Sequence, residues 1–393
     1  MSHAFKIIFA LIILGVGISA DQEIKKEFKM KSGKTLTVDL ETGGSILIKG
    51  WDENRISVVA FLDGRDCDDC DFEMKENSSG LEITSEFSRR RNHYSCDVDV
   101  EIQVPKKFNV DLKTNGGRLD VSNIEGDLRG KTNGGGLSLS DLKGDIDFHT
   151  NGGRVDCDKI YGKADITTNG GGIDCSNSEF DGRIHTNGGS IDLDNVSGDI
   201  DCTTNGGRVR YDDDESFKPL KTRKVVNINT KGGDIDVDSA PMGADVHTNG
   251  GNITIGEASE FVIAHTNGGE IYLSKVDGSV KAHTNGGDVK VEITGKETGK
   301  NRNIELSSNG GEITLILPPD FSASFDISLA YTKNSRRNYS IISDFDIRTR
   351  ESNDWNYDRG TPRKYIDGSG EINGGKNRIE IKTVNGDIKV KKS

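Results

Sequence analysis

The segment Lys131–Gly171, KTNGGGLSLSDLKGDIDFHTNGGRVDCDKIYGKADITTNGG, holds three copies of Thr-Asn-Gly-Gly, each beginning 18 residues after the previous one. The motif recurs far beyond this segment, and two of its spacings are lengthened to 26 and 24 residues. It begins at Thr114, Thr132, Thr150, Thr168, Thr186, Thr204, Thr248, Thr266 and Thr284, with the variants TKGG at Thr230 and SNGG at Ser308. A fixed period over so many copies indicates a repeat architecture.

Apolar residues keep a constant register relative to the Asn of each motif. They lie four and six residues after it, as Val155 and Cys157 do, and three residues before it, as Phe148 does. Polar residues separate these positions. Each motif is therefore flanked by two short segments with the period-two alternation that is typical of β-strands.

Glycine marks the ends of these predicted strands. We interpret the NGG as a tight corner made of residues that accept positive φ. A second corner is expected near Gly126, Gly144, Gly162, Gly182, Gly198 and Gly278. Two strands and two corners per 18 residues predict one rung of a β-solenoid, with rungs about 4.8 Å apart and equivalent residues stacked, Asn on Asn and Val on Ile. An up-and-down sheet or barrel is the alternative.

The composition limits the possible classes of protein and partner. The chain has 393 residues, of which 49 are Gly and 6 are Pro, and its aromatic content is only 6%. These values exclude collagen and a Pro-rich linker, and they give too few aromatics for a bulky globular core. A net charge of −13 argues against a nucleic-acid partner. We expect no cofactor.

The N-terminus, MSHAFKIIFALIILGVGISADQ, has the pattern of a secretory signal peptide. Lys6 forms the basic region, Ile7–Ile18 the apolar stretch, and Ser19 and Ala20 a small-residue cleavage site. No second long apolar run follows, so we expect no transmembrane segment in the mature chain. The expected location is the periplasm, the cell surface or the extracellular space.

Several stretches outside the repeats, together with the TNGG array, resemble one family. They are GGSILIKGW (Gly43–Trp51), LILPPDFSASFDIS (Leu315–Ser328) and RIEIKTVNGDIKV (Arg378–Val390). The likeness is to the bacterial putative-adhesin β-strand-repeat family of domains of unknown function, which is similar to putative auto-transporter adhesin head domains. The resemblance implies an exported, all-β, right-handed parallel β-helix and no established catalytic residues. The chain departs from the family by its long array, its six Cys and the irregular stretch Lys333–Ile366.

We therefore expect four segments. Residues 1–20 are a signal peptide, 21–110 an N-terminal β region that starts and caps the solenoid, 111–317 the regular array, and 318–393 irregular C-terminal rungs with an inserted loop. The expected function is that of a non-catalytic adhesin or envelope protein that binds a cell-envelope component, a glycan or another protein. The alternatives are a polysaccharide-active lyase or hydrolase, which needs a deep polar groove, and a cation-binding rod.

Cys67, Cys70, His93 and Cys96 have a spacing, C-x2-C…H-x2-C, that also occurs at zinc sites. Because an oxidising compartment favours disulfides, we predict one bridge within the three Cys and keep zinc as the alternative. The segment between them reads as a hairpin followed by a strand, which would bring Cys96 close to Cys67 or Cys70. The other three, Cys157, Cys175 and Cys202, fall at inward positions and are expected to fill the core.

Five of the seven His residues lie two positions before the motif Asn: His149, His185, His247, His265 and His283. The last three fall on consecutive repeats and could hold a transition metal. We favour a surface position that also accepts Lys and Thr, since tetrahedral ligation needs converging side chains.

An outward acidic register forms a second candidate cation site. Asp156, Asp174 and Asp192 share this register, which suggests calcium binding or, as the favoured interpretation, a solvated acidic face relieved by nearby Arg residues, Arg154 among them.

The richest aromatic and cationic cluster lies in the irregular stretch, and its members are Arg336, Arg337, Tyr339, Trp355 and Tyr357. Trp, Tyr and Arg are the residue types that anchor interfaces. Two insertions, Tyr211–Lys224 and Thr294–Asn303, are expected to project from one edge of the solenoid, where binding faces often form. We predict a binding surface there with Trp355 at its centre. The alternative is tolerated loops and an end cap.

Overall fold

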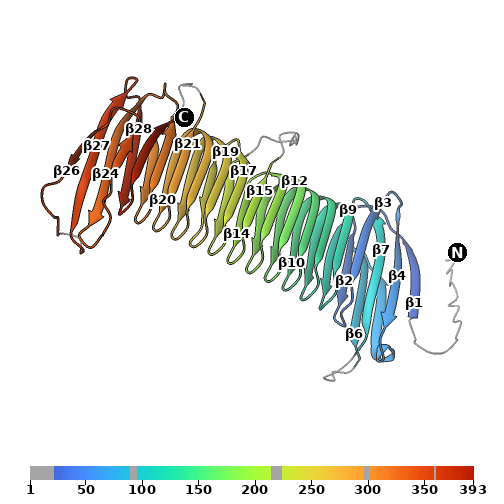
Figure 1. Ribbon diagram of the computed structural model, residues 1–393. Coiled ribbons are helices and arrows are strands. Elements are labelled where there is room, and N and C mark those ends of the chain that lie inside the picture. The colour runs from blue at the N-terminus through green and yellow to red at the C-terminus, as the bar shows by residue number, and fades with distance from the viewer. Residues whose placement is uncertain (1–21, 89–94, 214–223, 296–300, 358–359) are drawn as a thin grey trace, which may run out of the picture.

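The computed structural model describes residues 22–88, 95–213, 224–295, 301–357 and 360–393. The predicted signal peptide, His93, most of the first insertion and half of the second lie outside the described residues. The described chain is all-β, with 29 strands, one short 3-10 turn and no α-helix. It forms an elongated rod with β1 (Gln22–Lys29) near one end and β26 (Arg348–Glu351) near the other (Figure 1). Within these ranges no helix is long and apolar enough to cross a membrane.

The middle of the rod is a run of strands that we call the array, β9 to β23. Its strands are β9 (Leu119–Thr132), β10 (Leu137–Thr150), β11 (Val155–Thr168), β12 (Ile173–Thr186), β13 (Ile191–Ser197), β14 (Ile200–Thr204), β15 (Val209–Asp212), β16 (Val226–Thr230), β17 (Ile235–Ala240), β18 (Ala244–His247), β19 (Ile253–Thr266), β20 (Ile271–Thr284), β21 (Val289–Ile293), β22 (Ile304–Ser308) and β23 (Ile313–Leu317). Their pairing is parallel. Ile173 pairs with Val155 on one side and with Ile191 on the other, so paired residues are 18 apart in sequence.

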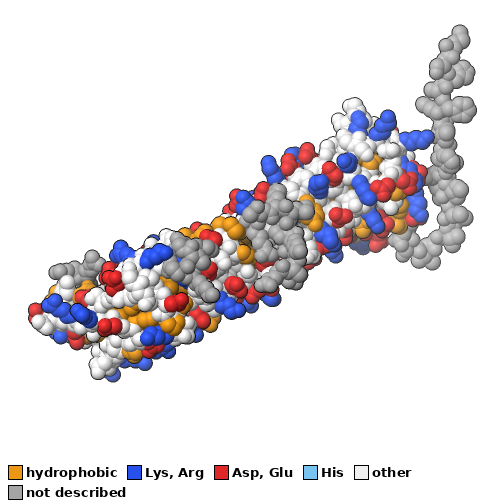
Figure 2. Space-filling model, turned by 90° about the horizontal axis from the view of Figure 1, so that it is seen from above, with side chains coloured by type: hydrophobic (Ala, Val, Ile, Leu, Met, Phe, Trp, Pro, Cys, Tyr) orange, Lys and Arg blue, Asp and Glu red, His pale blue; other side chains and the backbone are white. Residues whose placement is uncertain are grey.

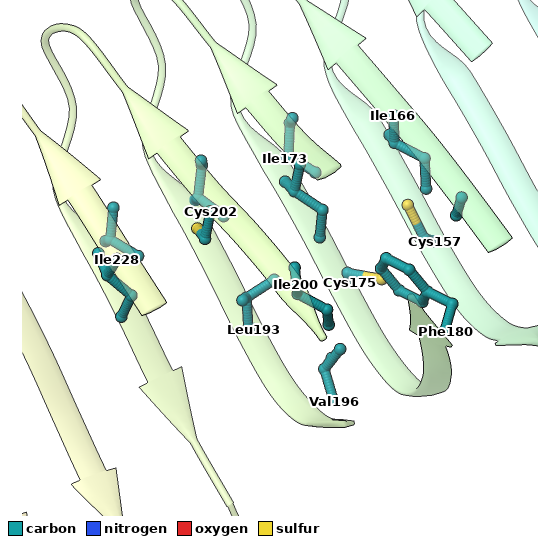
Figure 3. Close-up of a cluster of buried hydrophobic side chains, with 14 of the residues drawn as sticks. Cys157, Ile166, Ile173, Cys175, Phe180, Leu193, Val196, Ile200, Cys202 and Ile228 are labelled. Atoms are coloured by element: carbon teal, nitrogen blue, oxygen red, sulfur yellow. The ribbon is translucent and has the colours of Figure 1, made fainter. Parts of the chain in front are cut away.

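The interior of the array is a set of aliphatic ladders. Each apolar register found in the sequence is buried, as Phe148, Ile173 and Val155 illustrate. Cys157 and Cys175 lie in the same interior, beside Phe180 (Figure 3). The alternation of buried and exposed residues within one strand explains why a chain with few aromatics folds: each strand adds its own apolar face to the ladder below.

The NGG corner does not work as the sequence suggested. Its glycines do not adopt positive φ, so the interpretation based on conformational freedom is wrong. The second glycine is instead required by close packing between repeats. A Cβ on Gly171 would lie 2.0 Å from the carbonyl oxygen of Gly153, whereas a Cβ on the first glycine, Gly170, would meet nothing nearer than 3.5 Å. The repeats approach so closely at this corner that only a hydrogen fits at the second position.

The threonine that opens each motif fastens this corner. Thr150 is buried, and its hydroxyl donates to the carbonyl of Gly135 (2.7 Å) while accepting from the backbone N–H of Gly153 (3.2 Å). Thr168 repeats both bonds one repeat further on. The sequence period includes this threonine, but its two hydrogen bonds form only when the repeats stack.

The asparagines form the ladder that the sequence predicted. Asn151 Nδ2 donates to Asn133 Oδ1 (2.9 Å), and Asn169 Nδ2 donates to Asn151 Oδ1 (2.7 Å), along the exposed edge of the rod. Lys231, the residue that makes the motif TKGG, interrupts the series. Neighbouring repeats that both carry this Asn are therefore tied by a side-chain bond as well as by the backbone.

The second corner is partly as expected. Gly144 and Gly162 have positive φ (135° and 116°), but Gly126 and Gly278 do not. The backbone also enters the left-handed region three to five residues earlier, at a position for which the sequence predicted no turn. The residues there are Asn123, Asp141, Lys159, Asn177 and Asn195, with φ between 47° and 58°. Asn and Asp tolerate this conformation better than other side chains, which fits their frequency at this position.

The N-terminal strands combine parallel and antiparallel pairs. They are β1, β2 (Thr35–Leu40), β3 (Ile46–Trp51), β4 (Arg55–Asp63), β5 (Cys70–Glu76), β6 (Gly80–Phe87), β7 (Asp97–Pro105) and β8 (Asn109–Thr114). The predicted hairpin is β5–β6, and the strand expected after it is β7. The strand β2 pairs in parallel with β8, although Thr35 and its partner Asn109 lie far apart in sequence.

The C-terminal strands also pair over long sequence distances. They are β24 (Ala323–Thr332), β25 (Ile341–Ser343), β26, β27 (Arg363–Ile372), β28 (Asn377–Val384) and β29 (Ile388–Lys392). The last two stack directly on the array, β28 on β22 and β29 on β23. The strand β24 lies beyond them, paired with β28 and, antiparallel, with β27. The chain thus continues past the end of the array into β24 to β27. It then returns, so that β28 lies between β22 and β24 (Figure 1).

Candidate functional site

The predicted cluster lies at the C-terminal end of the rod, and Trp355 is its best-defined member. Trp355 follows β26, and a two-way backbone pair between Asn356 and Arg363 (2.8 and 2.9 Å) folds this segment back against β27. The half-buried indole meets the ring of Tyr331, at the end of β24, edge-on with 5.7 Å between ring centroids. The antiparallel pairing of β24 with β27 therefore positions the residues around the indole.

Two lysines share this indole. Lys333 Nζ lies 5.9 Å and Lys364 Nζ 5.5 Å from the Trp355 ring centroid, both within cation–π range. The Tyr331 hydroxyl donates to the Glu351 carboxylate, and this hydrogen bond raises the pKa of Tyr331 to about 12. Neither lysine was among the predicted site residues. A search for cations near Trp355 in sequence could not find Lys333, which lies 22 residues earlier.

The other predicted residues lie at the same end but do not all contact Trp355. Tyr357 is 61% exposed, and Arg336 and Arg337 are exposed in the turn after β24. Tyr339 packs against the core, and its hydroxyl receives a hydrogen bond from Ser335 (3.0 Å). In the described part of the chain, no ring contact joins Tyr339 or Tyr357 to Trp355.

This end of the rod differs in charge from the rest. Residues 333–393 carry 14 Lys and Arg against 9 Asp and Glu, a net charge of +5, whereas the whole chain carries −13, which leaves −18 for residues 1–332. Figure 2 shows Lys and Arg side chains on this end, with Asp and Glu among them. Six of the cations form no ion pair within the described residues: Lys333, Arg336, Arg337, Arg348, Arg350 and Lys364. A seventh, Arg363, has a buried Nε without a hydrogen-bond partner.

The N-terminal cysteines form a disulfide, and the bridge joins Cys67 to Cys96. Cys70 remains free and half-buried, and burial together with the Asp71 charge raises the pKa of its thiol. A disulfide sulfur is not a thiolate ligand, so the zinc alternative, which also needs His93 from outside the described residues, does not fit this bond. The free buried thiols of Cys157, Cys175 and Cys202 belong to the core, as predicted.

The three consecutive histidines stack as their register predicts. Ring centroids are 6.0 Å apart between His247 and His265 and 5.0 Å apart between His265 and His283. Burial, and then the charges of the two neighbouring imidazoles, lower the pKa of His265. His247 Nε2 lies 2.7 Å from Asp245 Oδ1. No group of His, Cys, Asp or Glu in the described ranges is arranged to hold a metal ion, so the metal alternative gains no support from this ladder.

The acidic register forms a partly compensated surface. Arg154 pairs with Asp156 (3.1 Å) and with Asp174, as the solvated-face interpretation expected. Burial raises the pKa of Asp174, opposed by Arg154 and reinforced by Asp192 and Asp156. These carboxylates line an open hollow of about 410 Å³ on the face of the array. The opposite strand face has similar hollows of about 390 and 420 Å³, lined by charged residues of both signs.

The fold and this end surface define an all-β repeat protein with a long parallel sheet and no α-helix among its described residues. The family model of the Toastrack DUF4097 domain matches residues 15–292, and the chain belongs to this family. This agrees with the resemblance drawn from the sequence. No curated protein matches the chain.

Solved structures with similarity to the chain are described as adhesins. A "putative cell adhesion protein" from Clostridium sporogenes is 12% identical, covers 95% of this chain and 100% of its own, and has a TM-score of 0.19. A "putative adhesin" from Parabacteroides merdae is 13% identical, with 76% and 90% coverage and a TM-score of 0.27. Another from Bacteroides fragilis is 13% identical, with 75% and 97% coverage and a TM-score of 0.20.

Proposed function

We propose that the chain is an exported, non-catalytic adhesin that binds a cell-envelope component, a glycan or another protein through the C-terminal end of the rod. The observation that carries this proposal is the cluster around Trp355. It combines an indole, exposed tyrosine and cations without ion pairs, the chemistry that anchors interfaces, in a chain with very few aromatics.

The rest of the rod acts as a stalk in this proposal. Residues 111–317, which hold the array and the end of β8, form a right-handed parallel β-helix with 18-residue rungs in this proposal, with residues 21–110 as its starting cap and 318–393 as its binding end. Threonine and asparagine ladders support this role, because they bond each repeat to the next and make bending costly. A stiff stalk holds a binding surface away from the surface that carries it.

Export supports the adhesive role. The N-terminal pattern of residues 1–20 is that of a signal peptide, and the bond between Cys67 and Cys96 suits an oxidising compartment. The protein is then located in the periplasm, on the cell surface or outside the cell, where an envelope component or a glycan is within reach.

A polysaccharide-active enzyme is the second candidate. The observation that favours it is the hollow of about 410 Å³ that contains Asp174, whose raised pKa suits a general acid. The hollow is open and shallow, with an arginine paired to its carboxylates, and this arrangement fits a solvated face better than a cleft that holds a sugar ring. Release of reducing ends from polysaccharides by the wild-type protein, abolished in Asp174→Asn, would favour the enzyme.

Binding to cell envelopes and to a glycan array tests the adhesive proposal. We expect Trp355→Ala combined with Tyr357→Ala to weaken binding by about tenfold or more, because truncation of an interface Trp typically costs about 2 kcal/mol. The matched control is Tyr272→Ala. Tyr272 is also exposed and also carries a lysine, Lys290, 5.0 Å from its ring, but it lies on the array.

The two variants separate the end of the rod from its side. The expected result is loss of binding in the end variant alone, with unchanged thermal unfolding in both. Equal binding by the end variant and the wild type, with loss in the array variant, would place the contact on the stalk and overturn the proposal.

A further inference from the structure

The cations at the C-terminal end are held together without compensating charge. Lys333, from the turn after β24, and Lys364, from β27, both approach one indole, and neither has a carboxylate within ion-pair distance in the described structure. The nearby carboxylate of Glu351 is engaged by the Tyr331 hydroxyl. Two positive charges gathered at one ring repel each other, and an anion bound beside them would reduce that repulsion.

More unpaired cations surround this pair. Arg336 and Arg337 are exposed in the turn that follows Lys333, and the backbone N–H of Lys333 bonds to the carbonyl of Pro362 (2.9 Å), next to Arg363. The buried Nε of Arg363 has no acceptor. Elsewhere on the molecule Lys and Arg commonly pair with carboxylates, as Lys113 does with Asp39 (2.8 Å) and Arg183 with Asp165 (2.9 Å). Some cations of the array, such as Lys290, also lack ion pairs among the described residues, and Lys382 and Lys389 at the C-terminal end are paired. The end surface is therefore distinguished by the grouping of two unpaired lysines around one indole.

We propose that the surface formed by Trp355, Lys333 and Lys364 binds a carboxylated polysaccharide, a polyuronate. This inference rests on the proposed adhesive function and names the class of its ligand. A uronate carboxylate pairs with the ammonium groups of Lys333 and Lys364, and the apolar face of a sugar ring packs on the indole or on the exposed ring of Tyr357. Arg336 and Arg337 receive carboxylates of the neighbouring sugars, in charge-assisted hydrogen bonds.

The charge of the whole chain favours a polymer over a membrane surface. Residues 1–332 carry a net charge of −18, so the length of the rod is repelled by an extended anionic surface. A single polyuronate strand can contact the end alone and avoid the acidic stalk. The aromatic component also favours sugar, because rings of Trp and Tyr offer flat apolar faces to pyranose C–H groups.

The test measures binding of the full-length mature protein to polygalacturonate and to alginate by isothermal titration calorimetry. The paired ligand control is fully methyl-esterified polygalacturonate, which keeps the sugar and loses the charge. The variant is Lys333→Gln with Lys364→Gln, and the control variant is Lys290→Gln, a lysine that lies over a tyrosine on the array. Circular dichroism and thermal unfolding check that both fold.

We expect binding to at least one polyuronate, about tenfold weaker or more in the Lys333/Lys364 variant, unchanged in the control variant, and lost on esterification. Raised salt weakens it. The inference is overturned if neither polyuronate binds, if the ester binds equally well, or if phosphatidylglycerol vesicles bind more tightly than polyuronate and show the same loss in the variant.

The outcome is separable from the proposed function. If Trp355→Ala with Tyr357→Ala abolishes envelope binding while the Lys333/Lys364 variant keeps it, the end surface is adhesive but its ligand is not a polyuronate. If both variants keep envelope binding, the proposed function fails as well.

Discussion

The array and the C-terminal end use the same corner chemistry but differ in how the chain reaches it. In the array, Thr168 bonds to Gly153 of the neighbouring repeat, only 15 residues earlier. At the C-terminal end, Thr383 makes the same bond to Gly311 (2.7 Å), 72 residues earlier, and a Cβ on Gly386 would lie 1.9 Å from the Gly311 carbonyl oxygen. The corner therefore depends on which backbone lies beneath it and not on sequence distance.

The end differs from the array in what it exposes. In the array, equivalent side chains lie above one another on successive repeats. Amides therefore bond to amides of the next repeat, as Asn151 does to Asn133, and cations pair with carboxylates, as Arg183 does with Asp165. The strands β24 to β27 have no repeat, and their exposed side chains include aromatics and unpaired cations. Regular stacking gives stability, and interruption of the stacking provides a distinct surface.

The largest expected effect lies in the array core. Ile173→Asp buries a charge without a partner between Val155 and Ile191, and we expect a loss of about 4 kcal/mol or more. Because neighbouring repeats stabilise each other, several should unfold together. Hydrogen exchange checks this. Protection lost only at residue 173, with flanking repeats intact, would contradict the view of the array as a cooperative stack.

A smaller effect is expected at the corner, where the two glycines of one motif provide a matched pair. Gly171→Ala places a Cβ against the Gly153 carbonyl oxygen and should destabilise by about 2–3 kcal/mol. Gly170→Ala meets no close atom and should change stability by less than about 0.5 kcal/mol. Urea unfolding of both variants measures the difference. Equal losses would mean that conformational freedom, and not close packing, requires these glycines.

The smallest expected effect concerns the histidine ladder. The lowered pKa of His265 means that the folded state binds a proton less readily than the unfolded state. The free energy of unfolding is therefore unaffected by His265 above the pKa of the unfolded state, about 6.5 for His, and it decreases as the pH falls below that value. His265→Thr, a residue that occurs in this register at Thr167, should flatten the fall in unfolding temperature between pH 7 and pH 5.

The prediction for His265 can be checked against a second histidine, and one outcome would contradict it. The control variant is His149→Thr, because the half-buried His149 lies one repeat below Thr167 and bonds to its hydroxyl rather than stacking on a second imidazole. An unchanged pH profile in His265→Thr would show that the ladder carries no linked proton.

Much of the fold could be predicted because its information is local. The 18-residue period, the alternation around each motif and the Asn ladder follow from residues close in sequence, and the β5–β6 hairpin follows from its own strands. The reason for the NGG glycines could not be predicted. It lies in the distance between two repeats, which no single repeat reveals.

The candidate site was predictable only in part. Its composition pointed to Trp355 and Tyr357, but not to Lys333 and Lys364, which the antiparallel pairing of β24 with β27 brings to the indole. The choice of Cys96 as the partner of Cys67, with Cys70 left free, was likewise open in the sequence.

The sequence by itself determined the strand-forming period and the buried registers, because backbone alternation and turn chemistry act within a few residues. Only the tertiary structure decided that β28 and β29 return to stack on β22 and β23, leaving β24 to β27 at the end. The physical reason is that parallel strands accept any partner whose apolar ladder continues their own. Whether β24 or β28 pairs with β22 therefore depends on the path of the whole chain, and no single strand sequence decides it.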